Sequence, residues 1–508
     1  MTDQTNGSSP IRLAAVATAV PAVKTLAALR ALAGEEIAHV VHLGGRDADF
    51  KANSFFRMRP VQARRGDLMA GDRFTGAARM LEWGPGMAEA QLEAIDNLTR
   101  GSDRMAYKFH GVQSFQDYQH ITHIARDALG RMLQEDRITH VLFFDIPHLF
   151  YDTCLKQAAE ALGLNVLILR QSFFPRQFFS MQDSYDLGHL QAPASDEAVL
   201  PYSLPAGGPD LFYMKGIGPD RAAPGRLSAR GIGQMLSHHL VNAPLKLLNP
   251  VYMLRLLRRM RRIARQFPQW RDPFFHFFHP DHLDYFEHIA KYEGQAVELD
   301  RPFVYFPLQF QPEMTTSSLG GRYRDQILAI EQLAGLLPED HLIYVKENPK
   351  QTGKMRSALF LQRLERIACV RIMPSHADSQ TLLSHAIAVA NVSGTVGWEA
   401  VCAGKPVLCF GAAWWAEAPG VTRYRPGLSL TEVLENVPEK PAVETYAGLL
   451  QARSHSGNVQ RHFAAADDGV SDVDNAQHVA TEILALLKGD ARLTFDPIGK
   501  GRSSSGAG

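Results

Sequence analysis

The sequence predicts an α/β protein with two Rossmann-like domains that face a central cleft. Its 508 residues exceed what one hydrophobic core usually supports. In both halves, short apolar runs alternate with amphipathic helical patterns, which is typical of parallel sheets covered by helices. Between the halves, from about Gln191 to Arg230, the sequence turns to Pro, Gly, Ala and Ser and the hydrophobic period fades.

The first half opens as strand, helix, strand, and a second unit of the same kind follows. The expected strands are Ile11–Thr18, Ala38–Leu43, Thr139–Asp145 and Asn165–Arg170, and the expected helices are Val23–Leu32, Tyr118–Gln134 and Asp152–Leu162. These elements predict a doubly wound N-terminal domain over residues 1–200.

The second half repeats this pattern after a linker and helical excursion over 201–300. The expected strands are Phe303–Phe310, Leu342–Lys346, Val370–Met373, Ala386–Ala390 and Val407–Phe410, with helices over Arg324–Leu337 and Ser357–Ala368. We predict a second Rossmann-like domain over 301–490 and a disordered tail over 491–508.

Composition narrows the function classes. Lysine and arginine total 53, as do aspartate and glutamate, so net charge gives no reason to expect nucleic acid as a partner. The four cysteines lack metal-ligand spacing, and residues 1–10 lack the pattern of a secretory signal. No apolar run reaches the roughly twenty residues of a membrane span. The sequence therefore predicts a cytoplasmic protein.

The run from Ser393 to Gly411 reads as turn, helix and strand after a buried strand. Ser393, Gly394 and Thr395 would let backbone N–H groups approach a phosphate at the start of the helix. Glu399 falls within the first turns of that helix and would accept hydrogen bonds from a ribose diol. The alternative is an ordinary turn that uses glycine for close packing.

Two more polar segments follow expected strands. The loop 311–321 offers Gln311, Thr315 and Thr316 to a phosphate or sugar, and Glu313 to orient a hydroxyl, unless the loop only caps the next helix. Lys346 and Asn348 would contact a phosphate, or else form a charged strand end and a turn.

Asp145 and His148 follow a strand of the first half and would face these groups across the cleft. A histidine with a near-neutral pKa can take the proton of an attacking hydroxyl, and Asp145 competes for that role. His148 could instead be a packing or capping residue, and Glu313 is the next candidate base. We expect no metal and no other cofactor, and interpret the run His276–His282 as packing rather than as a metal site.

The segment 245–266 interleaves arginines with Leu and Met, which is typical of a basic amphipathic helix. Such a helix can lie on an anionic membrane surface, although its apolar face can also pack on its own protein. A surface helix would suit an enzyme that extends a lipid-linked glycan on the inner face of a bacterial membrane. A nucleic-acid partner is not expected, because no recognisable module accompanies the basic patch.

Three segments within 303–411, PLQFQPEMTTSSLGGRYRDQ, YVKENPKQ and SGTVGWEAVCAGKPVLCFG, resemble the bacterial capsule polysaccharide biosynthesis family, which contains Kdo transferases acting on CMP-Kdo. The resemblance implies a metal-independent GT-B glycosyltransferase whose C-terminal domain binds the nucleotide sugar. It implies phosphate contacts from Ser393 and Thr395 and a ribose contact from Glu399. Asn348 stands where the family commonly has a histidine that contacts the phosphate, and could donate one neutral hydrogen bond there.

Two other function classes share these features. Sugar-nucleotide 2-epimerases have the same architecture and a similar Ser-Gly turn, but carry paired carboxylates where this chain has only Glu399. A non-catalytic partner in polysaccharide assembly or export would keep the fold with a degenerate site. Glycosyl transfer to a glycan or glycolipid, with CMP-Kdo as one possible donor, is the expected function.

Overall fold

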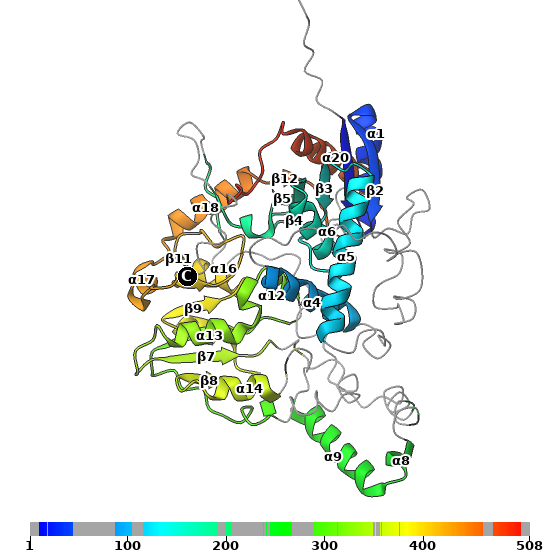
Figure 1. Cartoon of the computed structure of the whole chain (residues 1–508). Coiled ribbons are helices and arrows are strands. Elements are labelled where there is room, and N and C mark those ends of the chain that lie inside the picture. The colour runs from blue at the N-terminus through cyan, green and yellow to red at the C-terminus, as the bar shows by residue number, and fades with distance from the viewer. Residues whose placement is uncertain are drawn as a thin grey trace, which may run out of the picture.

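A computed structural model gives the fold of the chain (Figure 1). It describes residues 10–17, 19–43, 87–103, 115–190, 199–204, 237, 240, 244–266, 288–311, 313–348, 351, 356, 358–374, 376–460 and 471–498. Within these ranges the chain forms two six-stranded sheets.

The first sheet has the strand order β12-β5-β4-β3-β1-β2. Its strands are β1 (Ile11–Val16), β2 (Ile37–Leu43), β3 (His140–Phe143), β4 (Asn165–Gln171), β5 (Gln177–Met181) and β12 (His455–Ser456). The pairs among β1 to β4 are parallel, whereas β5 pairs antiparallel with both β4 and β12. The sheet is therefore parallel at its centre, with two antiparallel strands at one edge.

Alternate residues of each strand point to opposite sides of the sheet, and helices cover both faces because apolar residues lie on both sides. Leu13 and Ala15 lie in a buried cluster with α1 (Val20–Ala33) and α20 (Asp472–Lys488). Ala14 and Val16 lie in another cluster with the helices of the opposite face. Those helices are α4 (Met87–Asp103), α5 (Phe115–Glu135) and α6 (Phe150–Ala161).

The second sheet has the order β11-β10-β9-β6-β7-β8, and all its pairs are parallel. Its strands are β6 (Phe303–Pro307), β7 (Leu342–Lys346), β8 (Val370–Ile372), β9 (Ala388–Asn391), β10 (Val407–Cys409) and β11 (Val421–Arg423). The carboxyl ends of β6, β7 and β9 therefore meet at one edge, where ligands bind in open α/β sheets.

One face of the second sheet packs on helices of its own domain, and the other packs toward the first domain. The first group comprises α13 (Gln326–Ala334), α14 (Ala358–Glu365) and α17 (Leu430–Glu435). The second comprises α15 (Ser379–His385), α16 (Val396–Cys402) and α18 (Lys440–Ala452). The cluster beneath this second group continues into α4, α5 and α6, so the two domains share a hydrophobic core.

The chain returns to the first domain after α18. β12 pairs with β5, and α20 packs beside α1 (Figure 1). The sequence prediction had placed the whole of 301–490 in the second domain, and so did not include this return. It had also placed 491–508 in a disordered tail, whereas Phe495 is fully buried against Phe179. The predicted α/β class with two Rossmann-like, GT-B-like domains is confirmed by both sheets.

Candidate functional site

The loop after β6 and the turn after β9 meet at the carboxyl edge of the second sheet. The hydroxyl of Ser393 donates to the carbonyl oxygen of Thr315, which lies in α12 (Met314–Ser317). The side chain of Gln309 lies against the same turn, close enough that a Cβ on Gly394 would be 2.9 Å from the end of its amide group. Two segments that the sequence predicted separately thus form one structure.

Protein groups hold the turn from within. The Gly394 N–H donates to Asn391 Oδ1 at 2.7 Å. With its carbonyl oxygen facing the turn, Gln309 also accepts from the N–H groups of Ser393 and Gly394, at 2.7 and 2.5 Å. These donors already have partners, so a phosphate would bind at Ser393 only by replacing one of those hydrogen bonds. In this structure, Ser393 and Gly394 fix the shape of the turn.

Gly397, in the first turn of α16, serves packing. A Cβ at this position would lie 2.3 Å from the ring of Trp415, a side chain that is itself fully buried. Any larger residue would displace the indole. The close-packing alternative considered for this run therefore applies to Gly397.

Lys346 lies at the end of β7 and meets the first residue of α15. Its Nζ donates to Ser379 Oγ at 2.8 Å, and the Tyr305 hydroxyl lies 3.5 Å from the same oxygen. The residue is buried, with 9% of its surface exposed. Burial lowers the pKa of Lys346, and the charges of Asp378 and Glu293 oppose that shift. The result is a desolvated amine beside two hydroxyls.

Glu399 lies in the same neighbourhood. Gln380 Nε2 donates to Glu399 Oε2 at 3.4 Å, and burial raises the pKa of the Glu399 carboxyl. Burial raises the pKa of Tyr305 to about 12, with a further contribution from the charge of Glu399. We call Tyr305, Lys346, Ser379, Gln380 and Glu399 the donor cluster. Thr395 is the N-cap residue of α16, and its carbonyl oxygen accepts from Glu399 N at 3.0 Å.

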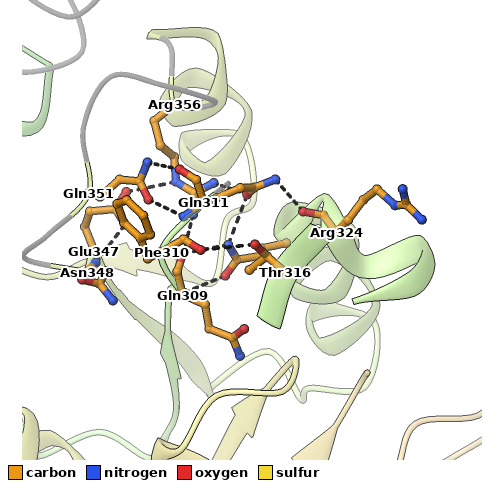
Figure 2. A network of polar contacts seen from close by, with 10 residues as sticks. Gln309, Phe310, Gln311, Thr316, Arg324, Glu347, Asn348, Gln351 and Arg356 are labelled. Atoms are coloured by element: carbon orange, nitrogen blue, oxygen red, sulfur yellow. Dashed lines mark hydrogen bonds and ion pairs between the residues drawn. The ribbon is translucent and has the colours of Figure 1, made fainter. Parts of the chain in front are cut away.

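Gln311 belongs to a buried network (Figure 2). Its Nε2 donates to Arg324 O at 2.8 Å, and its Oε1 accepts from Arg356 Nη1 at 2.6 Å. Gln351 exchanges two hydrogen bonds with its backbone, at 2.8 and 2.7 Å. The side chain of Gln311 is thus committed to holding the loop in place, although the sequence had proposed it for the ligand.

Arg356 is the centre of that network and is fully buried. Its Nε donates to Glu347 Oε2 at 3.2 Å and its Nη2 to Gln309 O at 3.1 Å. Its guanidinium also lies 4.2 Å from the ring of Phe360. One cation therefore connects the loop after β6 with the loop after β7, the two segments that carry the predicted ligand contacts.

The remaining second-domain candidates lie around this network. The Thr316 hydroxyl donates to Phe310 O at 3.2 Å and is fully buried, so it stabilises the loop. Thr315 and Glu313 are partly exposed, and the Thr315 hydroxyl donates to Glu313 Oε2 at 2.8 Å. Asn348 is partly exposed, and its side chain points away from the network in Figure 2.

Asp145 and Arg170 form an ion pair at the carboxyl edge of the first sheet. Arg170 Nη1 donates to Asp145 Oδ1 at 2.8 Å, and Ile146 N donates to the same oxygen at 2.9 Å. Gln460 Nε2 donates to the other carboxylate oxygen at 2.5 Å. Arg170 Nη1 also lies 3.5 Å from Met314 Sδ in α12 of the second domain. The ion pair of Asp145 and Arg170 in the first domain therefore contacts α12 in the second domain.

His148 lies near this pair, just before α6. Its Nδ1 lies 2.6 Å from Ile146 O. A carbonyl oxygen can only accept, so Nδ1 carries the proton and Nε2 is the basic nitrogen of the neutral ring. This tautomer is the one that a general base at Nε2 requires.

Sequence reasoning missed Tyr305, Ser379, Gln380, Arg170 and Arg356 as members of these clusters. Tyr305 lies inside an apolar strand, and Ser379 and Gln380 begin a short helix with no motif around them. Arg170 was visible as the polar end of a predicted strand, at the same sheet edge as Asp145. That shared edge is the signal that could have found it.

Within the ranges given above, no group of three or more His, Cys, Asp or Glu side chains is arranged to hold a metal ion. Among the same residues, no helix combines the length and apolar character needed to cross a bilayer. The run His276–His282 lies outside the described residues.

Comparison with known proteins gives one family. Residues 286–463 match the model of a family described as capsule polysaccharide biosynthesis protein, which confirms the resemblance predicted from 303–411. No curated protein matches the chain.

Several solved structures show distant similarity. The β-Kdo 2,7 transferase of Thermosulfurimonas dismutans KpsC is 12% identical, with 73% of this chain and 91% of that chain covered and a TM-score of 0.30. The β-Kdo 2,4 transferase of the same protein is 16% identical, with 68% and 87% covered and a TM-score of 0.27. The UDP-GlcNAc 2-epimerase of Methanocaldococcus jannaschii is 10% identical, with 94% and 99% covered and a TM-score of 0.21.

Proposed function

Because residues 286–463 carry the capsule polysaccharide biosynthesis region, we propose that the chain is a glycosyltransferase that moves a sugar from a nucleotide sugar to a glycan or glycolipid. The donor cluster is the observation that carries this proposal. It places a buried amine, hydroxyl groups and a carboxylate at the carboxyl edge of a parallel sheet, where nucleotides bind in such folds. CMP-Kdo is one candidate donor.

The donor cluster offers complementary groups to the two polar parts of a nucleotide. The Lys346 ammonium and the Ser379 hydroxyl would bind the phosphate, and Glu399 would accept hydrogen bonds from the ribose diol. Thr315, Thr395 and Asn348 lie at partly exposed positions around this cluster and would add neutral hydrogen bonds. Because Lys346 supplies a cation for the departing phosphate, the proposed transfer needs no metal.

The acceptor would be activated from the first domain. Its hydroxyl oxygen attacks the anomeric carbon, the bond from that carbon to the phosphate oxygen breaks, and the hydroxyl proton passes to His148 Nε2. Asp145 already accepts from Arg170, Ile146 and Gln460, so we assign it the role of holding Arg170 toward the acceptor. Glu313 is the second candidate base.

Release of CMP, UDP or GDP from a panel of nucleotide sugars tests the reaction, and calorimetry tests donor binding. Lys346→Met and Glu399→Gln should each weaken donor binding by about ten- to a hundredfold, as expected for losing one or two polar contacts. Lys405→Met is the matched control, since Lys405 donates to the backbone of Ala386 and lies outside the donor cluster. Unchanged affinity in both cluster variants, or an equal loss in the control, would contradict the donor site.

A kinetic comparison tests whether the first domain supplies the base while the second domain binds the donor. His148→Gln should bind donor normally and lower kcat by about a hundredfold or more, because it removes a base that acts only in the transition state. If turnover stays normal, Glu313→Gln is the next variant to measure. Conversion of UDP-GlcNAc without any acceptor would instead identify an epimerase.

We place this reaction at the inner face of the bacterial cytoplasmic membrane, where a lipid-linked acceptor would be found. Peripheral attachment would use the segment 245–266.

A further inference from the structure

Positive charge is concentrated in one projecting segment of this otherwise balanced protein. The chain as a whole has a formal net charge of zero. Residues 244–266 contain no acidic residue, and their basic residues are Lys246, Arg255, Arg258, Arg259, Arg261, Arg262 and Arg265. Positive charge segregated in this way favours an anionic partner.

The segment forms two helices, α8 (Pro244–Leu247) and α9 (Pro250–Gln266), which project from the body of the protein in Figure 1. Large apolar side chains are exposed where the two helices join. Leu245 and Leu248 are 79% and 80% exposed, and Val251, Leu254 and Leu257 follow on α9 with about half their surface exposed. We call these five residues the leucine corner.

The other side of α9 is attached to the second domain. Leu256 is buried in the cluster that also contains Ile289 and Tyr292, and Met253 is partly buried against it. The predicted alternative, in which the apolar face packs on its own protein, therefore holds for this side. The leucine corner is not part of that cluster, so self-packing does not account for it.

Arginines lie among the exposed apolar residues. Arg255, Arg258 and Arg261 are exposed, and they lie four residues after Val251, Leu254 and Leu257 respectively. In a helix, residues three or four apart lie side by side, so guanidinium groups and leucine side chains share one surface. Apolar groups at a tip with cations around them match the boundary between acyl chains and anionic headgroups.

We propose that α8 and α9 dock the protein on an anionic lipid bilayer, with the leucine corner inserted below the headgroups and the arginines of α9 against lipid phosphates. This inference rests on the membrane location in the proposed function, and it adds the lipid chemistry and the residues that meet it. Guanidinium groups suit this role because they bind phosphate oxygens in a bidentate manner.

Sedimentation of the full chain with lipid vesicles tests the proposal. Binding should require phosphatidylglycerol in phosphatidylcholine vesicles, and should weaken as salt is raised because screening shortens the range of the attraction. The triple variant Arg255→Glu, Arg258→Glu, Arg261→Glu should bind at least about 100-fold more weakly, since each cation near an anionic surface contributes about fivefold. Leu245→Asn with Leu248→Asn should lose about tenfold or more at the same charge.

The control reverses three exposed cations elsewhere on the second domain: Arg366→Glu, Arg371→Glu and Lys440→Glu. It makes the same change in net charge and should bind vesicles far better than the α9 variant. Circular dichroism should show every variant folded. Equal binding to neutral and anionic vesicles, an equal loss in the control, or a change in oligomeric state in place of lipid binding would overturn the proposal. Donor binding is measured without vesicles, so failure of the transferase proposal would be seen separately.

Discussion

Removal of the Arg356 cation should destabilise the second domain more than any surface charge does. The side chain of Arg356 is fully buried and Glu347 is 3% exposed, so neither charge can turn to solvent. In Arg356→Met, the Glu347 carboxylate stays buried without its cation, and two oxygens of Gln309 and Gln311 lose a charged donor. Breaking a buried pair in this way costs about 3–5 kcal/mol, and we expect a loss of stability in that range.

Urea unfolding followed by tryptophan fluorescence measures this loss, because Trp398, Trp414 and Trp415 all lie in the second domain. The matched control is Arg363→Met. Arg363 also pairs with two carboxylates, but its side chain is 38% exposed, so its removal should cost less than about 1 kcal/mol.

The double variant Arg356→Met with Glu347→Gln separates the buried charge from lost packing. Because it removes both charges of the buried ion pair, it should be less destabilised than the sum of the two single variants by more than about 1 kcal/mol. Strict additivity, or a loss in Arg356→Met no larger than in the Arg363 control, would refute the reasoning.

Four further variants test the packing and the titrating groups. Gly397→Ala should cost about 1–3 kcal/mol because its Cβ meets the Trp415 ring, whereas Gly335→Ala, with no contact closer than 3.4 Å, should be nearly neutral; urea unfolding compares them. Burial raises the pKa of Asp96 to about 6, so the stability that goes with its neutral carboxyl group is lost as pH rises through that value. Asp96→Asn should therefore raise the Tm at pH 8 and leave it nearly unchanged at pH 4. Burial lowers the pKa of His455, so the neutral ring stabilises the fold above about pH 6.5, and this stabilisation is lost as pH falls through the folded pKa. Below pH 6.5 the Tm of the native protein should therefore fall more steeply than the Tm of His455→Gln.

The strands of both sheets could be predicted because buried parallel strands are continuous apolar runs. The predicted bounds of Leu342–Lys346 match β7, and Asn165–Arg170 differs from β4 by one residue. β5 and β12 could not be predicted this way. β12 has only two residues, His455 and Ser456, and it is a strand only because β5 lies beside it.

For the site, the sequence indicated which segments would gather but not which atoms would pair. Parallel order places the ends of β6, β7 and β9 together, so Thr315, Lys346 and Ser393 could be expected at one edge. Whether a polar side chain there faces a ligand or the protein depends on its neighbours. Gln311 and Thr316 look like ligand groups in the sequence, yet both bind protein groups: Gln311 accepts from Arg356, which lies outside the three family-like segments, and Thr316 donates to the backbone of Phe310 in its own loop.

α12 contacts both the region proposed to bind the donor and the region proposed to bind the acceptor. On one side, Thr315 O accepts from the Ser393 hydroxyl, in the turn that precedes Glu399. On the other, Met314 Sδ lies 3.5 Å from Arg170 Nη1, which holds Asp145. A short helix in contact with a donor-side turn and an acceptor-side ion pair cannot shift without moving both. The network around Arg356 holds the loop that leads into this helix, so the buried residues that sequence reasoning assigned to the ligand would instead set the spacing between the two proposed substrate sites.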